Sequence, residues 1–517
     1  MKKNEIRLSI IGVALFLSAS ILSGDIQVQN AVDSITEAEI RDHIYFLASD
    51  ALRGRDTGDT GYEIAAEYAA SQFMAAGVRP LILDKDSNPG YPQLLNMTKF
   101  SFSPENTLSL RDGGDSSSLE FGTDYFIVSN STRELQEVSG PLVFIGYGIE
   151  DPDKDWDDLE RMNVSGSIPI VMFGLPGEEI TSAFAGQSPG NPWTSFQTRI
   201  SALESRGAVG IVAVLDPRSM DNWARMASSF TRDQLTVSGR APRSRFPDAK
   251  IPVIFLGPQI LRELFSNQDF DPVTLEGTYS TFSLEEASLT LVTQIQQEAM
   301  RVPNLVGVVE GSDPTLKNEF VVLGAHLDHL GIRSGEVYNG ADDNASGSVG
   351  VLEVAEAIAL APPKRSLLFV LFTGEERGLL GSRYFVENSP VPLKQIVAVV
   401  NIEMIGRWSH RPLGSDQLFA IIGNSEDGIL RETLTKVNEA GFGYQLDVPE
   451  KFFGGSDHAP FHNAGIPNIT IAGSPPYDTH DDYHRPGDDA DKIDISAMRK
   501  AAALIYKLTL ELANRIL

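Results

Sequence analysis

Side chains that bind metals or move protons follow apolar runs at two places in this chain. One apolar run ends in His326, and Asp328 follows two residues later. Another run, residues 367–372, leads to the adjacent pair Glu375 and Glu376. Such groups are uncommon directly after a buried strand in a purely structural segment. The pattern therefore predicts half of a metal-dependent hydrolytic site.

Each of these residues also has a structural interpretation. A lone histidine at a strand end is usually a surface residue, whereas a metal-bound imidazole needs its second ring nitrogen held by a carboxylate or carbonyl, which Asp328 could supply. Adjacent glutamates are usually solvated. In the functional interpretation, one glutamate binds a cation and the other takes a proton from water.

Further candidates lie downstream. Asp342 and Asp343 occupy a glycine-flanked loop before a predicted helix, where one aspartate could cap the helix and the other bridge two cations. Glu403 directly follows a mostly apolar strand, where a carboxylate is costly unless it is paired or metal-bound. His480 and His484 have helical metal-ligand spacing, but the surrounding prolines argue against a helix, so one of them is expected to bind.

These signals gain weight together, because every histidine except His43 falls between His326 and His484. Three carboxylates and two imidazoles from separate strand ends suit a pair of cations such as zinc. An Asp–His catalytic pair at Asp457 and His458 is a weaker alternative, since no Gly-x-Ser-x-Gly nucleophile motif accompanies it.

Strands and helices alternate over the last part of the chain. Strands are expected at 302–309, 320–325, 367–372, 397–402 and 468–472, and helices at 348–360, 428–440 and 495–514. This order predicts an α/β fold with a mostly parallel central sheet and helices on both faces. Such sheets bind ligands beyond the carboxyl ends of their strands. Residues 36–51 and 60–76 are expected to be scaffold helices without chemistry of their own.

The middle of the chain has a different residue pattern. Short strands separated by Gly, Asp, Ser and Pro predict a β-rich domain at residues 101–288. It would be inserted into a domain made of residues 33–100 and 289–517. A chain of 517 residues exceeds what one core usually supports, which agrees with two domains.

The net charge, the first residues and the cysteine count limit the partners and the location that we expect. The net charge of −28 disfavours nucleic acid and anionic lipid as partners and attracts cations. Residues 1–24 are typical of a signal peptide, with a retained anchor as the alternative, so we expect a chain exported to the periplasm or the medium without a retained membrane span. The chain has no cysteine, so no disulfide supports its fold.

The chain resembles the co-catalytic zinc exopeptidases typified by bacterial leucyl aminopeptidase, whose wider family includes glutamate carboxypeptidase II. The resemblance spans most of residues 304–494. It is carried by residues 324–328, 340–347, 375–376, 455–458, 463–467, 483–486 and 491–494. Residues 140–256 resemble a protease-associated domain more loosely, notably at 155–159 and 206–210.

The resemblance implies two zinc ions and a role for each candidate residue. It implies five metal ligands: His326, Asp343, Glu376, Glu403 and His484. Asp343 would bridge the ions, Glu375 would be the general base, and Asp328 would orient His326. The family usually has aspartate where this chain has Glu403. Lesser candidates for contacts with a substrate are Ser456, Asp457, His458 and Arg407.

The expected function is that of an exported aminopeptidase acting on peptides. A carboxypeptidase is the nearest alternative, because Arg407 could meet a substrate carboxylate, although a structural salt bridge is the commoner role for such a residue. A glutaminyl cyclase shares the metal architecture. A non-catalytic binding protein is the alternative from another class, with the inserted domain as its contact surface.

Overall fold

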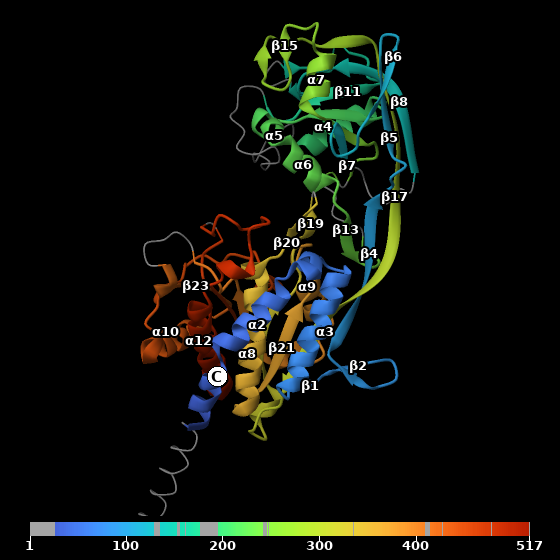
Figure 1. Cartoon of the computed structure of the whole chain (residues 1–517). Coiled ribbons are helices and arrows are strands. Elements are labelled where there is room, and N and C mark those ends of the chain that lie inside the picture. Colours follow the sequence, from blue (N-terminus) through green and yellow to red (C-terminus); the bar gives the residue numbers. More distant parts are fainter. Residues whose placement is uncertain are drawn as a thin grey trace, which may run out of the picture. The chain divides into compact units, whose positions relative to one another are not determined.

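The structure is a computed structural model of the chain (Figure 1). It describes residues 26–515 except for 129–134, 152–155, 161, 176–194, 241–245, 247, 334, 409–413, 426–427 and 477. The chain divides into two compact units. The first unit comprises Met1–Asn96 and Arg301–Leu517, and the second comprises Met97–Met300. The limits expected from the sequence for the inserted domain, 101 and 288, both fall inside the second unit.

The first unit is built on one sheet. Its strand order is β1 (Arg79–Pro80), the end of β17 (Phe282–Val309), β21 (Ser366–Phe372), β18 (Phe320–His326), β22 (Ile396–Glu403), β25 (Asn468–Ala472), β23 (Gln417–Gly423) and β24 (Gln445–Asp447). The four central strands, β21, β18, β22 and β25, are parallel to one another. The predicted α/β class with a parallel sheet centre is confirmed, and antiparallel neighbours flank that centre.

Helices cover both faces of this sheet, and the alternation of side chains along its strands explains how. Val322 of β18 and Phe372 of β21 pack with Phe385 of α9 (Leu380–Glu387) and Phe461 of α11 (His458–Asn463). The intervening residues point to the opposite face, where Phe369 lies 6.3 Å from the ring of Phe73 on α3 (Thr60–Ala75). On that face α8 (Gly347–Leu360) contacts the three strands β21, β18 and β22.

Two more helices complete this layer, and a third lies at the far end of the sheet. The 20-residue helix α12 (Ile495–Asn514) contacts α8 and β18, and α2 (Glu37–Leu47) packs against α8 and α12. Helix α10 (Ile429–Val437) contacts α12. The first predicted scaffold helix ends at Leu47, earlier than expected, and a 3-10 helix, η1 (Asp50–Arg55), follows it.

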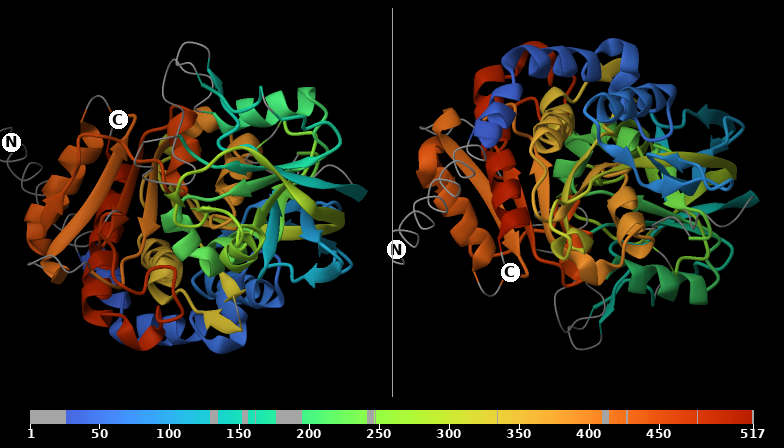
Figure 2. Two further views of the ribbon diagram at one scale, coloured as in Figure 1. Left: turned by 90° about the horizontal axis from the view of Figure 1, so that it is seen from above. Right: turned by 90° about the horizontal axis from the view of Figure 1, so that it is seen from below.

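The second unit has its own sheet and its own core. The sheet has the order β6 (Asp115–Leu119), β5 (Thr107–Asp112), β17, β8 (Leu135–Phe144), β11 (Ile168–Met172), β12 (Ile211–Val214), β14 (Val253–Leu256) and β7 (Tyr125–Val128). Green helices accompany it in Figures 1 and 2, namely α4 (Phe196–Ser205), α5 (Pro217–Asp221), α6 (Trp223–Phe230) and α7 (Pro258–Leu264). The unit is thus a mixed α/β body, less purely β than expected.

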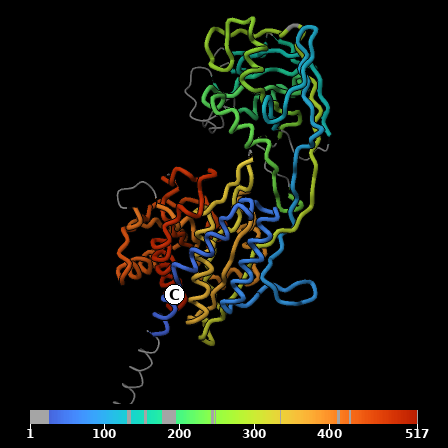
Figure 3. Tube along the Cα trace, viewed as in Figure 1, coloured from blue at the N-terminus to red at the C-terminus, as the bar shows by residue number. Residues whose placement is uncertain are grey.

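Two strands connect the units along the chain. The trace in Figure 3 passes into the second unit through β4 (Pro92–Phe102) and returns through the long strand β17. Among the described helices, none combines the length and the apolar character needed to cross a membrane. The predicted signal peptide, 1–24, lies outside the described residues.

Glu353, in the middle of α8, belongs to a small cluster of buried titratable side chains. Its residue is 4% exposed, and its Oε1 lies 3.8 Å from Nε2 of His43 on α2. Burial, together with Glu39 and Glu356, raises the pKa of Glu353 to about 8, although the Thr36 N–H and Arg499 oppose the shift. Burial also lowers the pKa of His43, against the charges of Glu39 and Asp42. Both groups are therefore neutral near pH 7.

Replacing Glu353 should change how stability depends on pH. Between the ordinary glutamate pKa of 4.5 and about 8, the folded protein holds a proton at Glu353 that the unfolded chain has lost. The free energy of unfolding therefore falls as pH rises through this window. We expect Glu353→Gln to raise the thermal midpoint by about 2–4 °C at about pH 9, the shift produced by roughly 1 kcal/mol in a domain of this size. At about pH 5 the gain should vanish.

The measurement is the midpoint of thermal unfolding, followed by circular dichroism for both proteins across this pH range. Exposed Glu63 on α3 supplies the matched control, because Glu63→Gln should leave the pH dependence unchanged. A constant difference between wild type and Glu353→Gln at every pH would contradict the shifted pKa.

Candidate metal centre

The sheet of the first unit places several predicted ligands at one edge. His326 is the last residue of β18, Glu403 is the last residue of β22, and Glu376 follows β21 by four residues. These three strands are parallel neighbours, so their carboxyl ends open onto the same edge. Apolar strands thus bring polar side chains together that lie far apart in the sequence.

Two loops complete the group. Asp343 lies in η5 (Ala341–Ser346), the irregular turn that leads into α8, and His484 lies between β25 and α12. The structure brings all five predicted ligand residues into one group. Whether they bind metal remains a prediction.

The first half of the group contains one imidazole and two carboxylates. His326 Nε2 lies 3.4 Å from Asp343 Oδ1 and 3.3 Å from Glu403 Oε1. His326 is 1% exposed, and its Nδ1 lies 3.0 Å from the carbonyl oxygen of Asp328. These three side chains form one of two described groups with the spacing of a cation site.

The second half shares Asp343 with the first. Asp343 Oδ2 lies 3.1 Å from His484 Nε2, which is 3.3 Å from Glu376 Oε1. A residue without a predicted role, His329, joins them: its Nδ1 lies 3.0 Å from Glu376 Oε1 and 3.7 Å from Asp343 Oδ2. His329, Asp343 and Glu376 form the other described group with cation spacing. The signal that could have found His329 is its place three residues after His326.

Several atoms of this group satisfy the chemistry of a cation site. Asp343 Oδ2, Glu376 Oε1 and both ring nitrogens of His329 are buried yet make no well-formed hydrogen bond within the described part of the chain. Buried polar atoms without hydrogen bonds are rare and call for an explanation such as an ion. Carboxylate oxygens and imidazole nitrogens are the donors that zinc prefers after thiolates. The residues present therefore fit a pair of zinc ions bridged by Asp343.

The charges of the group perturb one another strongly. Burial raises the pKa of Glu376, and Asp343 adds to this, but His329 and His484 outweigh both and lower it to about 2. Burial lowers the pKa of His484, yet Asp343 and Glu376 raise it to about 10. The carboxylates are therefore ionised, the state in which they bind cations.

Glu375 differs from its neighbour. Burial raises its pKa well above the ordinary value, and Glu376, Asp457 and Glu403 raise it further against the opposing effect of His326. Two adjacent glutamates thus have opposite tendencies, one to stay ionised and one to take up a proton. Neighbouring carboxyl groups whose pKa values are shifted in opposite directions are typical of catalytic sites.

Asp328 contacts the second ring nitrogen of His326 through its carbonyl, one of the two groups expected from the sequence, and its carboxylate has another role. The carbonyl oxygen of Asp328 contacts Nδ1 of His326, while its nearer carboxylate oxygen is 4.0 Å away. The carboxylate instead accepts the backbone N–H groups of Glu375 and Glu376, at 3.1 and 3.3 Å, and the Thr57 hydroxyl at 3.1 Å. Asp328 therefore holds the loop that carries both glutamates, and its backbone orients His326.

Among the described residues, three of the four lesser candidates contact other protein groups, and the exception is Asp457. The Ser456 hydroxyl donates to Glu403 Oε2 at 2.5 Å and accepts from Asn401 at 3.1 Å. His458 Nε2 lies 2.6 Å from the Phe453 carbonyl, and Asp457 is fully buried. Burial raises the pKa of Asp457 to about 7.

Arg407 pairs with Asp482 at 2.9 Å and with Asp488 at 3.5 Å. The sequence predicted a structural salt bridge as the commoner role for such a residue, and the structure contains one. Contact of Arg407 with a substrate carboxylate stays a prediction, and in the structure its guanidinium faces two protein carboxylates.

One buried arginine ties the ligand-bearing loops together. Arg55 is fully buried and donates to the carbonyls of Leu327 at 2.9 Å, Asn339 at 2.7 Å and Gly340 at 2.9 Å, and also to Leu47. Its own carbonyl accepts the backbone N–H of His329 at 3.1 Å. The 3-10 segment, whose last residue lies between the two predicted scaffold helices, thus fixes the loops before Asp343 and after His326.

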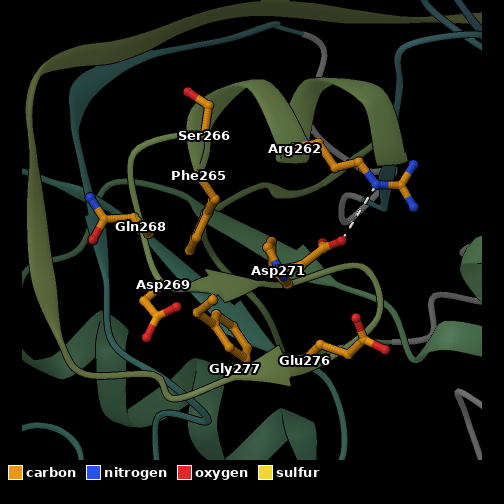
Figure 4. A pocket seen from close by; sticks show the side chains of 10 residues that line it. Arg262, Phe265, Ser266, Gln268, Asp269, Asp271, Glu276 and Gly277 are labelled. Atoms are coloured by element: carbon orange, nitrogen blue, oxygen red, sulfur yellow. Dashed lines mark ion pairs between the residues drawn. The ribbon is translucent and has the colours of Figure 1, made fainter.

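Two cavities lie apart from this group. One, of about 370 Å³ in the second unit, is lined by α7 and the β15 (Phe270–Asp271) region, where Asp271 pairs with Arg262 at 3.5 Å (Figure 4). The other, of about 550 Å³, lies beside α3 and is mostly apolar. Neither lining contains a residue of the two described groups with cation spacing, so neither is part of the candidate metal centre.

Comparison with protein families agrees with this placement. Residues 304–509 match the model of peptidase family M28. This part of the chain is an M28 peptidase domain. It contains the two described cation groups and Glu375.

Two curated relatives are similar to parts of the chain. It is 38% identical over 167 residues to leupeptin-inactivating enzyme 1 of Streptomyces exfoliatus, covering 32% of this chain and 34% of that protein. It is 26% identical over 298 residues to aminopeptidase YwaD of Bacillus subtilis, covering 55% and 62%. The chain thus spans less than two thirds of the length of either relative.

Solved structures share the fold over nearly the whole chain. An aminopeptidase from Aneurinibacillus sp. strain AM-1 aligns with a TM-score of 0.58 and 16% identity, covering 95% of this chain and 97% of that one. A zinc aminopeptidase from Bacillus subtilis aligns with a TM-score of 0.55 and 18% identity, covering 93% and 96%. At these identities the likeness shows a common fold.

The role of Arg55 leads to a prediction about stability. Lysine keeps the charge but lacks the planar fork that serves several carbonyls at once. We expect Arg55→Lys to lower the free energy of unfolding by about 2–4 kcal/mol, because at least two buried carbonyls lose their donor. Urea denaturation followed by fluorescence measures the loss.

Arg53 provides the control two residues away. Its side chain is 53% exposed and pairs with Asp59 at 3.3 Å, so Arg53→Lys should change the free energy of unfolding by less than about 0.5 kcal/mol. Equal stabilities for the two variants would show that Arg55 does not hold the loops.

Proposed function

We propose that the chain is a two-zinc aminopeptidase that removes N-terminal residues from peptides. One observation carries the proposal: two His/carboxylate groups share Asp343, whose oxygens face different imidazoles. A bridging carboxylate between two such groups suits a two-metal hydrolase. The names of the relatives, several of which are aminopeptidases, support the same activity.

Five residues of this chain would hold the two ions. His326 and Glu403 would hold one ion, Glu376 and His484 the other, and Asp343 both. When bound, zinc lowers the pKa of a water molecule to about 7 and polarises a carbonyl group. Ser456 holds Glu403 through its second oxygen, which leaves Oε1 directed at His326.

Glu375 would act as the general base. It removes a proton from water, the resulting hydroxide attacks the carbonyl carbon of the first peptide bond, and the protonated glutamate then gives its proton to the leaving amine. Its raised pKa suits a group that must hold a proton for part of each cycle. The Asp328 carboxylate positions it by accepting its backbone N–H.

The environment favours an aminopeptidase over a carboxypeptidase. A carboxypeptidase needs a cation for the substrate carboxylate, and the Arg407 guanidinium already faces Asp482 and Asp488. Asp457, whose charge acts on Glu375, is fully buried, and neither of its carboxylate oxygens makes a well-formed hydrogen bond among the described residues, which favours a substrate that carries an ammonium group instead.

We also propose, from the basic, apolar and small residues that follow one another there, that the chain is exported through a signal peptide at 1–24. We further propose that the second unit is a protease-associated domain. Its motif residue Trp156 lies in β10 (Trp156–Asp157), and Gly207 lies two residues after the end of α4.

Removing the proposed base should separate catalysis from metal binding. We expect Glu375→Gln to lower kcat on a leucine reporter amide by at least about 100-fold, because the amide cannot take up the proton. The zinc content, measured by inductively coupled plasma mass spectrometry, should stay at the wild-type value. Exposed Glu439 supplies the control, since Glu439→Gln should keep full activity. Wild-type kcat in Glu375→Gln would refute the assignment.

Peptides blocked at one end test which terminus is recognised. We expect cleavage of peptides with a free amino terminus and an amidated carboxyl terminus, and none of N-acetylated peptides. The reverse pattern, measured by mass spectrometry of the products, would indicate a carboxypeptidase. Ammonia released from N-terminal glutamine without peptide cleavage would indicate a glutaminyl cyclase. No turnover of any peptide by zinc-loaded protein would favour a binding protein.

A further inference from the structure

His329 lies inside the metal centre without a part in the five-ligand set. Its residue is fully buried, and its backbone N–H donates to the carbonyl of Arg55. A methyl group built on Gly340 would lie 2.4 Å from the ring atom Cγ, so the loop before Asp343 closes tightly over the imidazole. The backbone of His329 is thus fixed by Arg55 and its ring is covered by Gly340, with Nδ1 toward Glu376.

The distances around His329 match the shape of one coordination shell. Zinc bound tetrahedrally, with bonds of about 2.0–2.1 Å, places its donor atoms about 3.3–3.4 Å apart. His329 Nδ1 lies 3.0 Å from Glu376 Oε1 and 3.7 Å from Asp343 Oδ2. His484 Nε2 lies 3.3 and 3.1 Å from the same two oxygens. All four separations scatter closely around the tetrahedral edge.

We propose that His329 is a metal ligand, the second imidazole on the ion held by Asp343, Glu376 and His484. This inference rests on the proposed function, because it concerns the same pair of ions. It makes the two positions chemically unequal: one ion has two imidazoles and two carboxylates, and the other has one imidazole, His326, with two carboxylates. Imidazole is a good zinc ligand, so the ion at Glu376 binds more tightly.

The alternative role for His329 is electrostatic. A protonated ring could hold Glu376 as an ion pair and never touch a metal. The two roles differ in how many imidazoles surround the ions. As a ligand, His329 gives three imidazoles for two ions, whereas as an ion-pair partner it leaves two.

X-ray absorption at the zinc edge of the full chain loaded with two zinc ions counts these ligands. We expect an average of about 1.5 imidazoles per zinc in wild type and about 1.0 in His329→Gln. Competition with a chelator should show that His329→Gln weakens one of the two zinc affinities by about 100-fold or more, at least as much as the loss of an outer partner of a ligand does. The other affinity should stay within about threefold.

Wild-type protein tests the inference without any variant, so a folding defect in His329→Gln cannot hide the answer. His43→Gln is the matched control, because His43 contacts Tyr68 and Glu353 rather than the centre, and both zinc affinities should be unchanged. An average of 1.0 imidazole in wild type, with two zinc ions bound, would overturn the role of His329 alone. Wild type that binds no zinc would overturn the proposed function instead.

Discussion

Mutual repulsion among buried carboxylates is the constraint on which the first unit depends. Five aspartates of this region are each at most 3% exposed, namely Asp328, Asp342, Asp343, Asp457 and Asp488. The glutamates Glu375, Glu376 and Glu403 lie in the same region. Burial removes hydration from such groups, and like charges then drive their pKa values apart. Burial raises the pKa of Asp328 and Asp488 to about 6, whereas the neighbouring histidines hold that of Asp343 well below the ordinary value. The site is therefore divided between carboxyls that tolerate a proton and carboxylates that do not.

Protein groups offset part of this repulsion. Backbone N–H groups of Asp342 and Asp343 donate to Asp488, and those of Gly406 and Arg407 donate to Asp342. The charge of Arg55 acts on four of the carboxyl groups at once, at the cost of a pKa that burial lowers to about 10. These contacts hold outer carboxylates in place but leave Asp343 Oδ2 and Glu376 Oε1 without hydrogen bonds among the described residues. The negative charge of these two carboxylates is therefore available to cations. Cation binding there would also stabilise the folded state.

The sequence predicted the parts of this arrangement that follow from strand periodicity. Apolar runs marked β18, β21 and β22 to within about two residues, and a parallel sheet gathers whatever follows such runs at one edge. The convergence of His326, Glu376 and Glu403 follows from that alone. The direction of a side chain in a loop does not follow, because it depends on partners that periodicity cannot identify. Arg407 turns to Asp482 and Asp488, and Ser456 turns to Glu403, for this reason.

Arg55 shows why positioning residues are harder to predict than ligands. A metal ligand can be recognised in the sequence by its residue type, since histidines and adjacent carboxylates are scarce after apolar strands. An arginine in a glycine-containing loop has no such signal, because most arginines are solvated. What distinguishes Arg55 is the set of carbonyls that it reaches, three of which lie 272 to 285 residues later in the chain. Those carbonyls are free to accept only because their loops leave the sheet to carry ligands. The need for the arginine is thus created by the metal loops themselves, and only the folded arrangement reveals it.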